Sequence, residues 1–204
     1  MKLYNSRGPN PHVVRMFLAE KGVTLTTEMI DVIGGENRKA PYITNVNRRG
    51  QCPALELDDG SHIAEITAIC EYIDEKHPNP PLIGSTPEER GETRMWVRRI
   101  DLGFCEPMAN GFRYSDGHDM FKERIRVVPE AADGLKAIAQ DTLGWIDEEI
   151  EGRTFVCGGR FTLADIMLFC FVEFGNQRGQ PLNEGFQHIG EWFKRVQARP
   201  SAGA

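Results

Sequence analysis

The sequence predicts a chain of two domains, an α/β domain of order βαβ-ββα followed by an all-α helical bundle. Three observations carry this prediction. Strand and helix patterns alternate as far as Lys76, four prolines lie between residues 78 and 87, and strand patterns almost disappear after them. We therefore expect an α/β domain over residues 1–77, a linker over 78–87 and a helical domain over 88–204.

The first half of the α/β domain has the pattern of a strand, a helix and a second strand. Residues 2–5 can form a short strand, and an apolar stripe over 13–21 indicates a helix. Asn10 is the expected N-cap of this helix, with Pro11 at its first position. Residues 23–30 are rich in β-branched side chains and favour a strand parallel to the first.

The second half changes to a hairpin and a helix. Residues 54–57 alternate apolar and polar side chains, an Asp-Asp-Gly turn follows, and residues 61–64 can return antiparallel. Apolar residues at helical spacing then predict a helix over 66–76. A βαβ unit followed by a ββα unit is the thioredoxin-like arrangement.

The second domain shows helical patterns only. They cover residues 88–110, 128–149, 163–174 and 186–197. Thr162 and Asp165 have the spacing of a capping box at the start of the third helix. We expect a purely structural role for this pair.

Composition and charge limit the possible functions. The chain has 204 residues and a formal net charge of -6, which argues against a nucleic-acid partner. Its longest apolar run is too short to cross a membrane. The five cysteines include no Cys-x-x-Cys pair, which is typical of reduced thiols in a cytoplasmic protein without a zinc site or disulfide framework. We expect a cytoplasmic protein that binds neither metal, membrane nor nucleic acid.

Three segments together carry a more specific pattern. They are GQCPAL at 50–55 with DG at 59–60 and AEITAI at 64–69, then FTLADI at 161–166, then WF at 192–193 with ARP at 198–200. In this order and spacing they resemble the cytosolic glutathione S-transferases, and the likeness covers nearly the whole chain. The resemblance implies the family's fold, glutathione as cosubstrate, a small electrophile as second substrate, and a homodimer.

The resemblance also implies which residues bind glutathione. With Pro53 in the cis form, the backbone of Cys52 is free to pair with the cysteinyl part of the ligand. Glu65 would accept the ammonium group, and N–H groups at the helix start would bind the γ-glutamyl carboxylate. Ile66 stands where the family usually has serine, so Thr67 or the backbone must replace that hydroxyl. The alternatives are that Pro53 only shapes a turn and that Glu65 is a helix-start acid.

The catalytic residue is expected on the loop before the first helix. The segment 9–12 is similar to the nu-like branch of the family, which uses an asparagine at the place of Asn10, although Gly8 replaces a frequent threonine of that branch. The Asn10 amide could donate to the glutathione thiolate, or Asn10 could be a plain helix cap. Ser6 is the second candidate donor, and His12 is expected at the surface.

A cation is needed for the glycyl carboxylate of glutathione. Lys39 is our candidate, with Arg38 and Arg48 left open. The resulting hypothesis is a glutathione transferase that activates bound glutathione as a thiolate and serves detoxification. The alternatives are a glutathione-dependent disulfide reductase or peroxidase of the same fold, and a non-catalytic interaction module.

Overall fold

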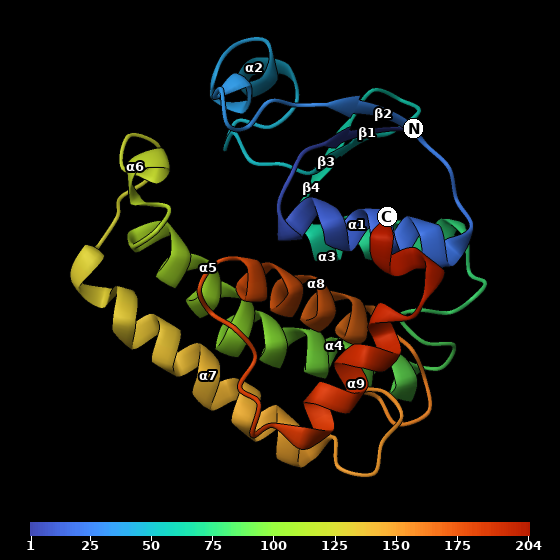
Figure 1. The fold of residues 1–204 in the computed structure, drawn as a ribbon. Coiled ribbons are helices and arrows are strands. Elements are labelled where there is room, and N and C mark those ends of the chain that lie inside the picture. The colour runs from blue at the N-terminus through green and yellow to red at the C-terminus, as the bar shows by residue number, and fades with distance from the viewer. The chain divides into compact units, whose positions relative to one another are not determined.

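The computed structural model describes residues 1–204 and divides into two compact units. Unit 1 consists of Met1–Pro81 with Gly203–Ala204, and unit 2 of Leu82–Ala202. Figure 1 labels the elements of each. No helix in either unit is long and apolar enough to span a membrane.

Unit 1 is a four-stranded sheet with helices packed on it. Its elements are β1 (Lys2–Asn5), α1 (Pro9–Lys21), β2 (Thr26–Met29), a 3-10 turn (Glu36–Arg38), α2 (Tyr42–Asn45), β3 (Ala54–Glu56), β4 (His62–Ala64) and α3 (Ile66–Lys76). The strand order is β2-β1-β3-β4, with β1 and β2 parallel and the other pairs antiparallel. The expected βαβ-ββα order is confirmed, and α2 is an addition that the sequence did not signal.

The two faces of this sheet pack differently. Leu3 and Leu55 are paired across β1 and β3 and are both fully buried. Figure 1 shows α1 and α3 side by side along one face of the sheet. Side chains alternate along a strand, so Tyr4 points to the opposite face, where its ring meets that of Tyr42 on α2 edge-on at 5.9 Å. Helix α2 therefore covers part of the second face.

The start of α1 differs from our expectation. The helix begins at Pro9 and its N-cap is Gly8, with φ 116°, so the prediction of Asn10 as N-cap is wrong. Proline suits the first helical position because it has no N–H to satisfy, and Gly8 can adopt the positive φ that the preceding turn requires. Asn10 thus lies inside the first turn. His12 is also not a surface residue, since it is only 9% exposed.

The C-terminal ends of α1 and α3 are joined by a buried ion pair. The Lys21 ammonium contacts the Asp74 carboxylate, and the Lys21 side chain is fully buried. Lys21 also donates to the backbone oxygens of His77, at 2.8 Å, and Pro80. These bonds tie the proline-rich segment after α3 to the α/β unit.

Unit 2 is helical, as expected. Its elements are α4 (Pro87–Ile100), a π-helical turn (Asp101–Cys105), α5 (Glu106–Tyr114), α6 (His118–Phe121), a 3-10 turn (Pro129–Ala131), α7 (Ala132–Glu149), α8 (Leu163–Gln177), α9 (Gln187–Gln197) and a 3-10 turn (Pro200–Gly203). The single helix expected over residues 88–110 is therefore interrupted by the π-helical turn. In Figure 1, α5 and α7 run alongside each other, and α8 packs on α4.

The expected capping box at the start of α8 is confirmed. The Thr162 hydroxyl accepts the Ala164 N–H, and Asp165 accepts the Thr162 N–H at 2.9 Å. Both side chains are fully buried. The pair therefore serves the fold of unit 2, as its spacing indicated.

Candidate functional site

Strand register brings the predicted site residues of unit 1 to one edge of the sheet. Tyr4 pairs with Ala54, and Ala54 pairs with Ala64. The residues one step further along each strand are Asn5, Pro53 and Glu65. The end of β1, the approach to β3 and the start of α3 consequently lie side by side. Because α1 follows β1 after a short turn, α1 begins at the same edge, with Asn10 in its first turn.

The Cys52-Pro53 peptide bond is cis, as the resemblance implied. Cys52 directs its thiol into the cluster around Tyr42, donating to the Tyr42 hydroxyl at 3.2 Å. That hydroxyl donates in turn to the Gln51 carbonyl at 2.7 Å. No loop or turn hydrogen bond uses the backbone N–H or C=O of Cys52. The side chain is thus occupied while the backbone is left for a ligand.

The Cys52 thiol is held in its neutral form. Burial raises the pKa of the thiol above its ordinary value, and the hydroxyls of Tyr42 and Ser6 oppose this rise only in part. A nucleophilic or redox-active cysteine needs a lowered pKa. Cys52 is therefore a poor nucleophile, and its place in the site comes from its backbone.

Glu65 has an unusual backbone conformation. It is the N-cap of α3, and among the non-glycine residues of the chain it alone has a positive φ, of 73°. Non-glycine residues in this region are concentrated at ligand sites. The first N–H bonded back into the helix is that of Ile69, which donates to the Glu65 carbonyl. The preceding N–H groups and the positive helix end therefore face outward beside an exposed carboxylate.

The two candidate donors to the thiol lie in different surroundings. Asn10 is partly buried in the first turn of α1, and its side chain makes no hydrogen bond within the chain. Ser6 is only 2% exposed. Its hydroxyl lies 3.4 Å from the Arg7 carbonyl and also interacts with the Cys52 thiol. The Asn10 amide is thus unoccupied, whereas the Ser6 hydroxyl already has partners.

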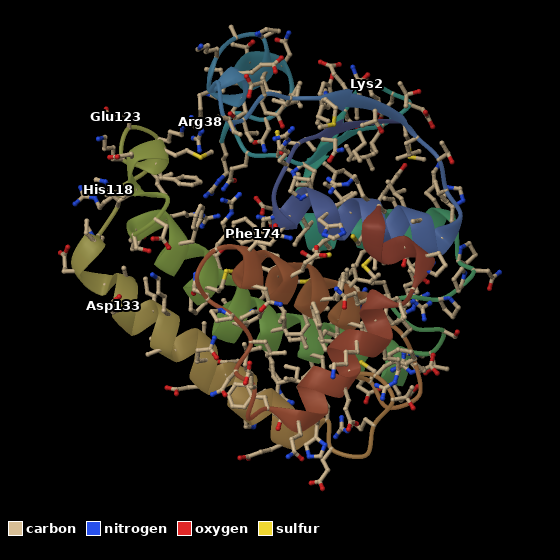
Figure 2. All side chains as sticks on the ribbon, in the orientation of Figure 1. Lys2, Arg38, His118, Glu123, Asp133 and Phe174 are labelled. Carbon is tan, nitrogen blue, oxygen red and sulfur yellow. The ribbon has the colours of Figure 1, made fainter.

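The segment before Cys52 carries the candidate cations. Lys39 is exposed directly after the 3-10 turn. Arg38, labelled in Figure 2, donates to the Arg49 carbonyl at 3.2 Å. Asn37, which sequence analysis does not identify, is buried and donates to the Gly50 carbonyl at 2.6 Å. This hydrogen bond closes the loop that leads to Cys52, and no periodic sequence pattern predicts it.

Gly50 is required at the closing point of that loop. Its φ is 60°, and a Cβ at this position would lie 2.6 Å from the Asn37 carbonyl oxygen. Only glycine meets both conditions without strain. The course of the chain into Cys52 and Pro53 therefore depends on a glycine at residue 50.

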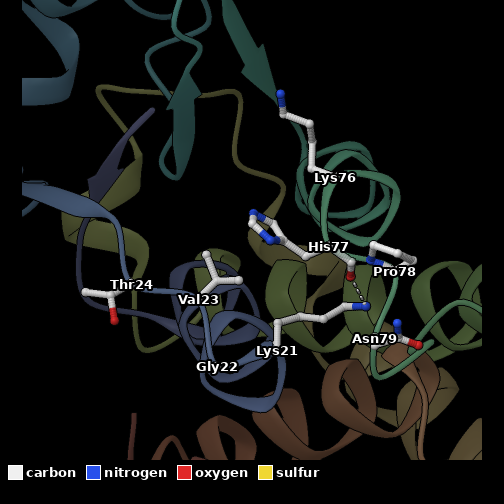
Figure 3. A pocket seen from close by; sticks show the side chains of 8 residues that line it. All are labelled: Lys21, Gly22, Val23, Thr24, Lys76, His77, Pro78 and Asn79. Carbon is white, nitrogen blue, oxygen red and sulfur yellow. Dashed lines mark hydrogen bonds between the residues drawn. The ribbon is translucent and has the colours of Figure 1, made fainter.

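Unit 1 also has a groove of about 490 Å³ at the other end of its helices. It is lined by Lys21–Thr24 and Lys76–Asn79, which follow the C-terminal ends of α1 and α3. Figure 3 shows Lys21 reaching across it to the His77 carbonyl. The Lys21 charge is neutralised by Asp74. The groove is separate from the candidate site, which lies at the N-terminal ends of the same helices.

Comparison with known proteins decides the family. Residues 8–76 match the sequence model described as "Glutathione S-transferase, N-terminal domain", and residues 126–200 match that of the C-terminal domain. "Glutathione S-transferase 2" of Saccharomyces cerevisiae is 32% identical over 198 residues, which are 95% of this chain and 84% of that protein. The chain belongs to the glutathione S-transferase family.

Solved structures of this family share the fold over the whole chain. The crystal structure of Gtt2 from Saccharomyces cerevisiae has a TM-score of 0.92 and 32% identity, and covers 100% of this chain and 99% of that one. A glutathione S-transferase domain-containing protein from Marinobacter aquaeolei also has a TM-score of 0.92, with 33% identity over 99% of this chain and 100% of that one. The glutathione S-transferase fold expected from the sequence is confirmed.

Proposed function

We propose that this glutathione S-transferase is an enzyme that binds glutathione on unit 1 and activates it as a thiolate for attack on a small electrophile. One observation carries the proposal. In a chain of this family, the free backbone of Cys52, the carboxylate and helix start at Glu65, and the first turn of α1 lie at one edge of the sheet.

This edge offers a partner for each charged or polar part of glutathione. The Cys52 backbone pairs with the cysteinyl part as a strand edge would. The Glu65 carboxylate takes the ammonium group, and the N–H groups at the start of α3 take the γ-glutamyl carboxylate. Thr67 supplies the hydroxyl that Ile66 lacks. Lys39 is exposed and takes the glycyl carboxylate.

Activation requires the sulfur of glutathione to lose its proton. The positive end of α1 and the unoccupied Asn10 amide favour the thiolate, while the proton passes to water. The thiolate then attacks the electrophilic carbon, a carbon–sulfur bond forms, and the leaving group departs with its electron pair. Ser6 is the second donor at this point. The protein supplies deprotonation and position and forms no covalent bond.

The neutral form of the Cys52 thiol favours transfer of glutathione to an electrophile over glutathione-dependent disulfide reduction. A reductase without a Cys-x-x-Cys pair needs a protein thiolate or a second glutathione. The raised pKa of Cys52 makes that thiol an unsuitable partner in disulfide exchange. We therefore propose transfer to an electrophile, and with it a role in detoxification.

We further propose that the protein forms a homodimer in the cytoplasm. Unit 2 exposes four large apolar side chains on α4, the π-helical turn and α7, namely Met95, Leu102, Ile138 and Trp145. Trp145 stacks on Trp96, and Thr142 donates to the Gly103 carbonyl at 2.7 Å, so these elements form one surface. A second copy would cover it. None of the five cysteines forms a disulfide bond, which suits a reducing compartment.

Titration with glutathione by calorimetry at neutral pH tests the proposed site. We expect binding in the micromolar-to-millimolar range. Glu65→Gln should weaken it by about 10-fold, because the amide keeps an acceptor oxygen but loses the negative charge that pairs with the ammonium group. Glu75→Gln, on the far end of α3, is the matched control and should bind as wild type. No binding by the wild-type protein would refute the proposed function and favour an interaction module.

A further inference from the structure

The guanidinium group of Arg15 connects three separate parts of unit 1. Arg15 lies in α1 and is partly buried. Its Nη1 donates to the side-chain oxygen of Asn5 at 3.0 Å and to the backbone oxygen of Ser6 at 3.1 Å. Its Nε donates to the backbone oxygen of Ala204 at 3.0 Å. A planar guanidinium can hold several acceptors at fixed angles, which a lysine ammonium cannot do.

Two of these acceptors lie where β1 turns into α1. Asn5 is the last residue of β1 and is 4% exposed. Its side-chain amide donates to the Met29 sulfur at 3.2 Å, and its backbone carbonyl accepts the Ile30 N–H at 2.8 Å. Ser6 is equally buried. Arg15 thus connects this turn to α1, and Asn5 connects it to the end of β2.

The same turn leads directly to the groups that face the proposed thiol. After Ser6 it passes through Gly8, whose positive φ sets the direction of the chain, and enters the first turn of α1 at Pro9. Asn10 follows at once. A shift of Ser6 or Asn5 would be passed along this short connection to the Asn10 amide.

We propose that Arg15 is the positioning residue of this turn and that it favours the thiolate form of bound glutathione. It acts by fixing the Ser6 carbonyl and the Asn5 side chain, and by placing a permanent positive charge next to the turn. This inference rests on the proposed function. It goes further by assigning control of the thiol to a residue outside the segments that the ligand touches.

Loss of Arg15 should affect kcat and the KM for glutathione differently. The groups proposed to bind glutathione are at Cys52, Glu65 and Lys39, whereas the Arg15 hydrogen bonds described above go to Asn5, Ser6 and Ala204. Loss of Arg15 should therefore leave the KM for glutathione nearly unchanged. It should raise the pKa of the glutathione thiol and so lower kcat at neutral and acidic pH. A defect in folding alone would not shift the pH profile.

The test measures steady-state conjugation of glutathione with an activated aryl halide as a function of pH. With glutathione saturating, Arg15→Gln should raise the pKa of the acidic limb of the profile by about one unit. This corresponds to about tenfold lower kcat/KM for the aryl halide below that pKa. Arg15→Lys keeps the positive charge but not the planar guanidinium group, and should show a smaller shift of this pKa. Arg98→Lys, exposed on α4, is the control and should match the wild type. Urea unfolding of each variant confirms that the proteins compared are folded.

The outcomes distinguish this inference from the proposed function. A folded Arg15→Lys protein with the wild-type pH profile overturns the positioning role of Arg15, even if Arg15→Gln does not fold. Wild-type profiles in both variants overturn it as well, and leave the glutathione transferase intact. A wild-type protein that neither binds nor turns over glutathione overturns both proposals together.

Discussion

Trp192 on α9 donates its indole N–H to the carboxylate of Asp165 at the start of α8, at 2.9 Å. The same carboxylate accepts the backbone N–H groups of Val156 and Thr162, each at 2.9 Å. Asp165 is fully buried, so every one of these donors depends on it. One side chain thereby joins the segment before α8, the start of α8, and α9.

Replacing Asp165 by alanine should damage the fold and not the chemistry. Several buried donors would lose their acceptor, so we expect the free energy of unfolding to fall by roughly 3–5 kcal/mol in urea titrations. Activity per folded molecule should stay at the wild-type level. Asp141→Ala, exposed on α7, is the control. A variant of normal stability that has lost activity would contradict the structural role.

The buried Lys21–Asp74 pair gives a second stability prediction. Lys21→Met leaves the Asp74 carboxylate without its cation, and breaking such a pair should cost about 3–5 kcal/mol of unfolding free energy. The double variant Lys21→Met/Asp74→Leu should recover the part of this loss that comes from the unpaired carboxylate. The His77 and Pro80 carbonyls lack the Lys21 donor in both variants. Urea denaturation measures both. Equal stability of the single and double variants would show that the charge pair is not the cause.

Cys52 should react slowly with alkylating agents in the folded protein. Burial raises the pKa of its thiol, so at a given pH less of it is thiolate than in an unfolded chain. The rate of reaction with iodoacetamide should therefore rise with pH beyond the range in which an ordinary cysteine has reached its plateau. Mass spectrometry of the modified peptide, in native and urea-unfolded protein, gives the comparison. Rapid native alkylation near neutral pH would contradict the assigned thiol form.

Gly50 and Gly60 form a matched pair for testing the loop before Cys52. Both have a positive φ, but only a Cβ at residue 50 would meet the Asn37 carbonyl, at 2.6 Å. Gly50→Ala should therefore destabilise the protein by about 1–3 kcal/mol more than Gly60→Ala. It should also weaken glutathione binding, measured by calorimetry, because the loop positions the Cys52 backbone. Equal effects of the two substitutions would remove Gly50 from the account.

Elements with local signals could be predicted from the sequence. The β3–β4 hairpin has an Asp-Gly turn between alternating strands, α3 has an apolar face, and Thr162 with Asp165 forms a capping box. Helix α2 could not be predicted, because four residues are too few to show a helical period. The π-helical turn at Asp101–Cys105 lies inside a continuous helical sequence pattern, which does not predict it.

The site was predictable where it follows a motif and not where it depends on distant contacts. Pro53 and Glu65 belong to a segment whose order and spacing are typical of the family. Asparagine favours the N-cap position, so the sequence predicts Asn10 as the cap, but Gly8 is the N-cap and the helix begins at Pro9. The contact of Cys52 with Tyr42 and the reach of Arg15 to Ser6 are set by tertiary packing, for which the sequence holds no local signal.

The central claim is that the protein lowers the pKa of the glutathione thiol, and the ultraviolet absorbance of the bound thiolate measures this most directly. The protein's own buried cysteines, among them Cys70 and Cys105, have raised pKa values and should stay neutral in the titration. S-methylglutathione, which has no thiol, gives the baseline. We predict a thiolate signal at a pH at which free glutathione is still protonated, diminished in Asn10→Ala. A bound thiol that titrates like free glutathione would contradict the account.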